Sequence, residues 1–109
     1  MIKVVEWIGS SLKDVQSFPK DAKREIGHAL DNLQHGYAPA DWKPMPSIGS
    51  GVYEIRVHTD GEYRVVYITK FCKKIYVLHA FKKKTQKTPK KDIDISQARL
   101  KEAMANIRG

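Results

Sequence analysis

The sequence is poor in the features that mark several large classes of protein. Cys72 is its only cysteine, which excludes an intramolecular disulfide and a zinc site built on paired thiols. No apolar run approaches the roughly 18 residues of a membrane span, and residues 1–3 lead into a short strand-like segment without the pattern of a signal peptide. We therefore expect a cytoplasmic protein that has no membrane partner.

Several catalytic and cofactor motifs are also missing. The chain has no phosphate-binding glycine loop, no dinucleotide motif and no serine–histidine–acid set. His28 and His35 are seven residues apart, but no third ligand follows, so we expect no metal site and no cofactor. Trp7 and Trp42 are interpreted as packing residues, and His79, inside an apolar segment, as a core histidine.

Acidic residues are scarce compared with basic ones. The 109 residues include 12 Asp and Glu against 20 Lys and Arg, a net charge of +8, and six of the lysines lie within residues 82–91. Such a concentration of like charge costs stability in a compact domain unless an anionic partner or nearby carboxylates offset it. The charge favours nucleic acid or another polyanion as partner, and the length predicts one domain, residues 1–109.

The first half of the chain predicts one strand and two helices. Residues 2–8 have the length of a strand, and residues 11–14 fit the start of a helix with Ser11 as its cap. Residues 18–33 carry apolar side chains at three-and-four spacing, with Pro19 at the first helical position and Gly36 at the C-terminal cap. Residues 37–51, which hold three prolines, predict a loop.

The second half predicts three strands and a helix. Residues 52–58 alternate between apolar and polar side chains, and a turn signal at 60–61 leads into residues 63–69 and then 75–81. Thr88 is the expected N-cap of a C-terminal helix, with Pro89 at its first position. We expect a compact α+β domain: a mainly antiparallel four-stranded sheet with the two N-terminal helices on one face and the C-terminal helix packed beside it.

The register of the hairpin at 60–61 decides where the polar side chains lie. A two-residue loop pairs Val57 with Arg64 and puts Arg64 on the apolar face, whereas a longer loop, bulged at a left-handed Gly61, pairs Arg56 with Arg64. We favour the second register because a buried arginine without a partner is costly. In this register Tyr63 and Tyr67 face the core. One exposed patch then gathers Glu54, Arg56, His58 and Arg64.

The lysine cluster at 82–91 leads into the start of the C-terminal helix. Free amide donors and the positive end of the helix dipole favour an anion there, yet Lys90 and Lys91 occupy the first turn, where acids are the favoured residues. We interpret the segment as a phosphate-binding corner; the alternative is a solvated loop partly neutralised by Asp92 and Asp94. The expected RNA or phosphate contacts are Lys82, Lys84, Thr85, Lys87, Thr88, Lys90 and Lys91.

Four strings carry a resemblance to a known family: YEIR at 53–56, YRVVY at 63–67, LHAF at 78–81 and KKTQKTP at 83–89. Together with the order of elements, they resemble the phage-derived HigB-like branch of the RelE/ParE toxin superfamily. The resemblance covers nearly the whole chain and implies a RelE-like fold, cleavage of messenger RNA in the ribosomal A site, and a cognate antitoxin, often a helix-turn-helix protein. Two alternatives stay open: a gyrase inhibitor like the ParE branch, and a non-catalytic phage protein that binds nucleic acid.

The implied reaction is metal-free RNA cleavage, in which the ribose 2′-OH attacks the adjacent phosphate. Such an enzyme must stabilise an anionic transition state and move protons. Arg64 matches the arginine that this superfamily places after the hairpin, and we expect it to stabilise charge at the scissile phosphate, with Arg56 and Lys83 as the next candidates. The proton of the 2′-OH is expected to pass to Glu54, to His58, or to a lysine whose pKa is lowered by the cluster.

Overall fold

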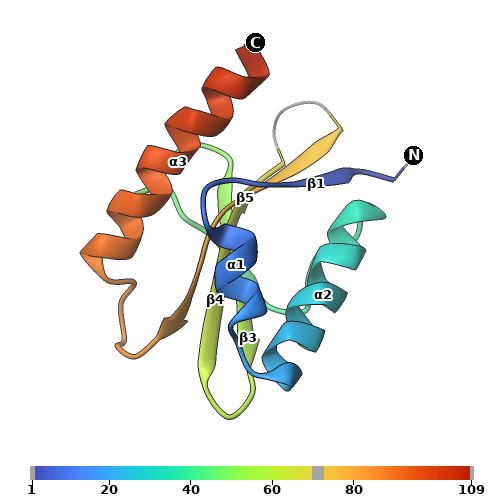
Figure 1. Cartoon of the computed structure of the whole chain (residues 1–109), viewed down its shortest axis with the longest axis vertical. Helices are drawn as coiled ribbons and strands as arrows, with labels where there is room; N and C mark the ends of the chain where they lie inside the picture. The colour runs from blue at the N-terminus through green and yellow to red at the C-terminus, as the bar shows by residue number, and fades with distance from the viewer. Residues whose placement is uncertain (1, 70–72, 109) are drawn as a thin grey trace.

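The computed structural model describes residues 2–69 and 73–108, and Cys72 lies outside them (Figure 1). The elements are β1 (Val4–Trp7), α1 (Ser11–Gln16), α2 (Lys20–Gln34), β2 (Trp42–Pro44), β3 (Val52–His58), β4 (Glu62–Ile68), β5 (Lys74–Lys83) and α3 (Lys90–Arg108). The strands form one sheet in the order β1-β5-β4-β3-β2. Only β1, which runs parallel to β5, departs from antiparallel pairing within the described sheet. The predicted α+β fold is confirmed, with one more strand than expected.

The extra strand, β2, lies inside the segment predicted as a loop. Trp42 pairs with Ile55, and Pro44 pairs with Tyr53. Proline is tolerated here because β2 is the outermost strand, so its missing N–H removes no bond from an inner ladder. The prediction of a loop over residues 37–51 is therefore wrong for its middle part.

Two helix starts also differ from the prediction. Ser10 rather than Ser11 precedes α1, and its hydroxyl lies 3.0 Å from the Asp14 carboxylate. Ser11 is buried, and its hydroxyl donates to the Val77 carbonyl at 3.1 Å, which ties α1 to β5. Pro19 precedes α2 instead of occupying its first position.

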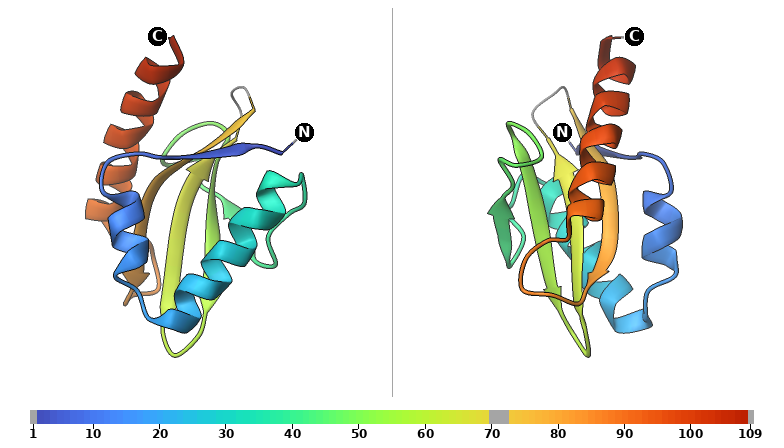
Figure 2. Two further views of the ribbon diagram at one scale, coloured as in Figure 1. Left: turned by 45° about the vertical axis from the view of Figure 1, so that its right-hand side comes forward. Right: turned by 90° about the vertical axis from the view of Figure 1, so that its left-hand side faces the viewer.

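Alternate residues of the strands separate the sheet into two faces. The apolar face packs against α1 and α2, and its side chains include Ile55, Val57, Tyr63, Val65, Tyr67 and Val77. The mixed face packs against α3, and its apolar side chains include Val52, Val66, Ile68, Tyr76, Leu78 and Phe81. Figure 2 agrees with this layering, since α1 and α2 lie together and α3 lies apart from them across the sheet. The C-terminal helix thus covers a face of the sheet, whereas we had expected it beside the sheet.

The predicted hairpin register is confirmed, although its turn differs. Arg56 lies opposite Arg64, and Val57 lies opposite Tyr63. Gly61 does not have a positive φ, unlike Gly9, Gly36 and Gly51, so the expected left-handed bulge is absent from this turn. The loop is residues 59–61, closed on its inner side by the pair His58 and Glu62.

The expected exposed patch is partly buried. Glu54 is 0% exposed and Arg64 is 3% exposed, because α3 and the loop that leads into it lie over the mixed face. We favoured this register because it was expected to keep Arg64 exposed. In the structure the same register leaves Arg64 buried, with Glu54 beside it. None of the helices in the described residues combines the length and hydropathy that crossing a membrane requires.

Candidate functional site

A basic hollow opens on the mixed face at the β3–β4 hairpin, which is at the bottom of Figure 1. Arg56 lies opposite Arg64, and Glu62 lies opposite both His58 and Lys83. Residues that pair directly across an antiparallel sheet project from the same face. The hollow has a volume of about 570 Å³, and its lining is Arg56, Glu62, Arg64, Lys83, Lys84, Thr85 and Gln86. The structure therefore gathers three of the five predicted catalytic residues around one space.

Arg64 is held in place from three sides. Its Nη1 donates to the Tyr63 carbonyl at 3.0 Å, and its Nη2 donates to the Glu62 carboxylate at 3.1 Å. Its Nε lies 3.5 Å from Oε1 of the buried Glu54. A guanidinium fixed in this way needs little reorganisation to stabilise a developing negative charge.

Glu54 also connects the basic hollow to the loop before α3. Its Oε2 accepts a hydrogen bond of 3.2 Å from the Thr88 hydroxyl. The prediction that Thr88 caps α3 is therefore wrong: the helix begins at Lys90, and the hydroxyl is turned toward the sheet. This bond lets one buried carboxylate orient both Arg64 and the end of the lysine cluster.

Arg56 stands next to Arg64 with less support. Its Nη1 is 4.0 Å from the Asp41 carboxylate, and its side chain is 34% exposed. Within the described residues, the Nε atoms of Arg56 and Arg64 are buried without a hydrogen-bond acceptor, as is Oε1 of Glu54 without a donor. Arg64 Nε and Glu54 Oε1 face each other at 3.5 Å as an ion pair, so, in the described part of the chain, the Nε of Arg56 is the one of these three atoms without an oppositely charged atom beside it.

His58 lies between two carboxylates at the rim. Its Nε2 is 2.6 Å from Asp41, and its Nδ1 is 2.7 Å from Glu62. The hydrogen bond to Asp41, followed by the one to Glu62, raises the pKa of His58. The same contacts lower the pKa of Asp41 and of Glu62. His58 is thus stabilised as an imidazolium whose two N–H groups are both engaged, and Asp41 and Glu62 are site residues that the sequence reasoning missed.

Lys83 differs chemically from the other lysines of the cluster. Burial, followed by the charge of Arg64, lowers the pKa of Lys83. The charge of Glu54 opposes this shift, and smaller contributions from Lys43 and Arg56 add to it. A lowered pKa increases the fraction of neutral amine, which is the form that accepts a proton. One candidate base in the sequence was a lysine of lowered pKa, and Lys83 has this property.

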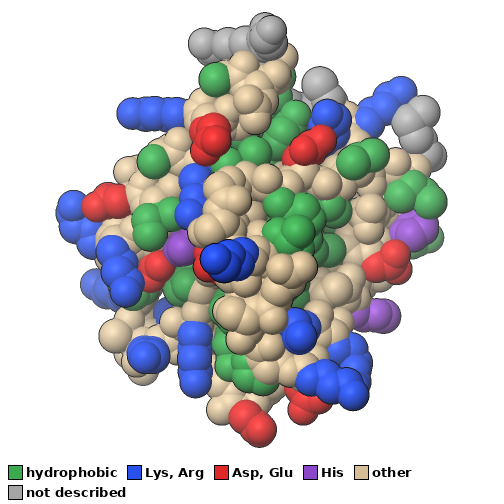
Figure 3. All heavy atoms as spheres, viewed as in Figure 1, with side chains coloured by type: hydrophobic (Ala, Val, Ile, Leu, Met, Phe, Trp, Pro, Cys, Tyr) green, Lys and Arg blue, Asp and Glu red, His purple; other side chains and the backbone are tan. Residues whose placement is uncertain are grey.

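The remaining residues of the lysine cluster divide by position. Lys84 and Thr85 line the basic hollow with Lys83. Lys82 projects from the opposite face, with its Nζ 6.0 Å from the centre of the Tyr63 ring. Figure 3 shows Lys and Arg side chains gathered on the side of the molecule where α3 begins.

The start of α3 holds two further lysines of the cluster, both outside the basic hollow. Lys90 pairs with Asp94 at 3.1 Å, and Lys91 is exposed. Asp92 is buried, 2.7 Å from Nε2 of His79, so it does not act as a solvated neutraliser of the cluster. His79 is a buried core histidine, as predicted, and its contact with Asp92 joins α3 to β5.

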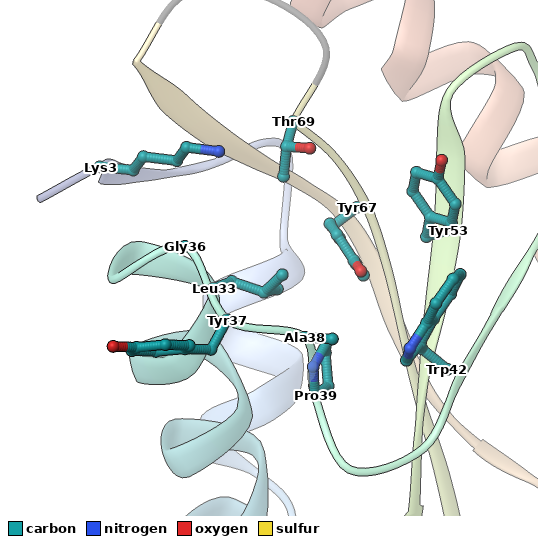
Figure 4. A pocket seen from close by; sticks show the side chains of 10 residues that line it. All are labelled: Lys3, Leu33, Gly36, Tyr37, Ala38, Pro39, Trp42, Tyr53, Tyr67 and Thr69. Carbon is teal, nitrogen blue, oxygen red and sulfur yellow. The ribbon is translucent and has the colours of Figure 1, made fainter.

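An aromatic hollow of about 200 Å³ lies elsewhere, lined from α2, β2, β3 and β4 (Figure 4). The ring centres of Trp42 and Tyr53 are 5.4 Å apart, and those of Tyr53 and Tyr67 are 5.9 Å apart. Burial raises the pKa of Tyr67 to about 12, so its hydroxyl stays neutral at physiological pH. Among the described residues of its lining, Lys3 is the one that carries a charge. This hollow lacks the charge that the basic hollow has.

Trp42 packs edge-on against Tyr53, in agreement with its interpretation as a packing residue.

The described residues also contain no group of three or more His, Cys, Asp or Glu side chains arranged to hold a metal ion. The side chains that line the basic hollow carry guanidinium, ammonium, carboxylate, hydroxyl and amide groups.

The match to a known family covers most of the chain. Residues 13–101 match the family described as phage-derived protein Gp49-like. The chain belongs to this Gp49-like family. No curated protein matches its sequence significantly. The predicted phage-derived lineage is thereby confirmed, and the assignment to the HigB branch stays a prediction.

Two solved structures share the fold of this Gp49-like chain. One is a double arginine-to-alanine mutant of the E. coli toxin RelE in the free state, with a TM-score of 0.65 and 13% identity over 94% of this chain and 98% of that one. The other is the toxin–antitoxin complex RelBE2 from Mycobacterium tuberculosis, with a TM-score of 0.56 and 17% identity over 76% of this chain and 100% of that one. The fold is RelE-like, as predicted.

Proposed function

We propose that this Gp49-like protein is the toxin of a type II toxin–antitoxin pair and cleaves messenger RNA on the ribosome. The observation that carries the proposal is the basic hollow, where Arg64 is held rigidly beside Arg56 and a lysine of lowered pKa. Support also comes from the net charge of +8 and from the RelE-like fold, since two of the similar structures are a toxin and a toxin–antitoxin complex.

The reaction needs a base, a stabiliser of negative charge and no metal. The neutral amine of Lys83 takes the proton of the ribose 2′-OH as that oxygen attacks the neighbouring phosphorus. Arg64 and Arg56 donate to the non-bridging oxygens, whose negative charge grows in the transition state. The bond to the 5′ oxygen breaks, and this oxygen takes a proton from water. The products are a 2′,3′-cyclic phosphate and a free 5′-OH.

Glu54 and His58, which the sequence placed among candidate bases, take positioning roles in this mechanism. Glu54 is fully buried between Arg64 and Thr88, away from the lining of the hollow. His58 is stabilised in its protonated form, which cannot accept a proton from the 2′-OH. Through Glu62 and Asp41, the imidazolium instead fixes carboxylates that contact the two arginines.

The rest of the lysine cluster is proposed to bind phosphates outside the reacting bond. Lys84 and Thr85 stand on the wall of the basic hollow, while Lys87, Lys90 and Lys91 extend along the loop and the first turn of α3. Contacts of this type bring the backbone of RNA into position without reading its sequence. Lys82, on the other face, is expected to contribute through general attraction.

Mapping of transcript ends after brief induction tests the proposed function. We expect the parent protein to create new 5′-OH ends inside translated messages, and a variant with Arg56→Gln to create far fewer. Arg56 is chosen because its partial exposure makes the substitution mild for folding. DNA damage without new RNA ends would favour gyrase inhibition instead, and the absence of both effects would favour a protein that only binds nucleic acid.

The proposed partner is a cognate antitoxin, expected to be a helix-turn-helix protein, whose toxin-binding segment is acidic. Such a segment laid over residues 82–91 would neutralise the lysines and block the basic hollow, and its binding would weaken as salt rises. Acetylation of the complex checks this: lysines of the cluster are expected to be protected. Full reactivity of these lysines in the complex would contradict direct masking.

A further inference from the structure

A second hollow adjoins the basic hollow. Its walls are residues 43–47, from β2 and the loop that follows it, and residues 86–88, from the loop before α3, together with Ile93. Its volume is about 340 Å³. Gln86 lines both hollows, so the two spaces share a wall.

Hydrogen bonds fix the wall that comes from β2. The Gln97 side chain of α3 donates to the Ser47 carbonyl at 2.8 Å, which ties the loop to the helix. The Met45 N–H donates to the Val52 carbonyl at 2.8 Å, and Met45 itself is buried. This wall is therefore formed before any ligand arrives, and the cost of ordering it on binding is small.

The opposite wall is also held in place. The Thr85 hydroxyl donates to the Lys87 carbonyl at 2.7 Å, and the Thr88 hydroxyl donates to Glu54 at 3.2 Å. These bonds fix the backbone on both sides of Lys87 and leave its side chain exposed. Lys87 is thus presented from a fixed loop rather than from a free one.

Each wall contributes one lysine ammonium group beside an apolar surface. Lys43 pairs with Glu54, so it projects from the mixed face toward the side that carries the basic hollow. Lys87 comes from the facing wall, and Pro44 and Pro46 supply exposed apolar rings. Charge for a phosphate beside an apolar surface for a base or ribose is the combination that single-stranded nucleic acid requires.

We propose that this hollow is a subsite for the nucleotide adjacent to the scissile phosphate of single-stranded RNA. Lys43 and Lys87 contact the phosphate of that nucleotide, and the proline rings contact the face of its base. The subsite rests on the proposed function, because it takes its place in the strand from cleavage in the basic hollow. It extends the contact with RNA from one reacting phosphate to at least one neighbour.

Binding of short RNA tests the subsite without the need for cleavage. Synthetic oligoribonucleotides of increasing length, with a 2′-deoxy sugar at each possible cleavage position, are titrated in competition against a fluorescent RNA at several salt concentrations. The variants are Lys43→Met and Lys87→Met, and the control is Lys101→Met, at an exposed position of α3 that lines neither hollow. Methionine keeps the apolar stem and removes only the charge.

The expected result depends on length. Lys43→Met and Lys87→Met should bind the oligonucleotides that fill both hollows about fivefold to tenfold more weakly than the parent does. They should bind the shortest oligonucleotides as the parent does. Each variant should lower the slope of log affinity against log salt concentration by about 0.7. Lys101→Met binds as the parent does. Equal losses at every length, no loss, or a parent that does not bind RNA would each overturn the subsite. A length-dependent loss in a protein that never cleaves RNA would uphold the subsite and reject only the endonuclease.

Discussion

The two faces of the sheet use the same strands in opposite ways near the β3–β4 hairpin. On the apolar face, Tyr63 and Val65 lie under α1 and α2 in a continuous core. On the mixed face, Arg64 lies between them in sequence but projects toward the basic hollow. Lys82 and Lys83 repeat this contrast on β5, one over the Tyr63 ring and the other in the hollow. A shift of one residue along a strand therefore separates packing from chemistry.

Stability and function are divided between the two faces of the sheet. A fully buried aliphatic side chain contributes roughly 1.5–3 kcal/mol, and the apolar face holds many of them. The buried pair of Arg64 and Glu54 has a contact of 3.5 Å and leaves an atom of each group without a hydrogen bond in the described residues. Such a pair contributes little net stability, since desolvation offsets most of its attraction. Its presence is better explained by the hollow that it serves.

Removing the arginine of the mixed face should have the largest effect. Arg64→Ala is expected to lower cleavage by a hundredfold or more, and also to destabilise the fold by about 3–5 kcal/mol, because Glu54 is left buried without its partner. Arg64→Lys keeps the charge and separates the two effects. We expect it to fold, as measured by urea unfolding, and still to lose most of its cleavage because the fixed guanidinium is gone. A folded Arg64→Lys protein as active as the parent would remove Arg64 from the site.

A deletion on the apolar face should affect stability alone. Ile55 is 1% exposed, and Ile55→Ala is expected to cost about 2–5 kcal/mol through lost burial and a residual cavity. At a temperature where the variant stays folded, its cleavage rate per folded molecule should equal that of the parent. Urea unfolding and cleavage of the same sample measure both quantities. A large fall in the rate of the folded variant would show that the two faces are coupled.

The smallest expected effect is a pH dependence of stability from the rim of the basic hollow. The lowered pKa values of Asp41 and Glu62 stabilise the fold above their unfolded values of 3.8 and 4.5, and this is lost as pH falls through the folded values. The raised pKa of His58 stabilises the fold below 6.5, and this is lost as pH rises through its folded value. The urea midpoint of the parent should therefore exceed that of His58→Gln by more at pH 5.5 than at pH 9. The difference is small because these side chains are largely exposed. An unchanged difference would mean that the ion pairs do not form in solution.

Much of the fold follows from patterns that the sequence displays. Alternation in residues 52–58 and 63–69 predicted two strands, and the avoidance of an arginine among apolar side chains gave the observed pairing of Arg56 with Arg64. The strand β2 was missed because it is three residues long and contains Pro44. Asp41 and Lys43 were missed with it, since only the pairing of this segment brings them to the site.

The burial of Glu54 and Arg64 could not be predicted from the sequence for a different reason. Strand periodicity shows which residues share a face, but it does not show how far a distant helix covers that face. The contact between His79 and Asp92 places the start of α3 over β5 and thereby brings the loop with Thr88 against Glu54. The strand predicted at 75–81 also ended two residues too early. Because β5 continues to Lys83, the side chains of Lys82 and Lys83 project from opposite faces of the sheet.

Cleavage of messenger RNA on purified ribosomes by Lys83→Met and by Lys82→Met tests whether Lys83 on the mixed face is the base. The two positions are neighbours in sequence, the substitution is the same, and only Lys83 lines the basic hollow. If Lys83 is the base, Lys83→Met should lower turnover at saturation by roughly a hundredfold or more, and the rise of the parent's rate with pH, as the amine becomes neutral, should disappear. Lys82→Met should retain the parent's turnover and pH profile. Equal activity of the two variants, or loss in both, would contradict the role of Lys83 as the base on the mixed face.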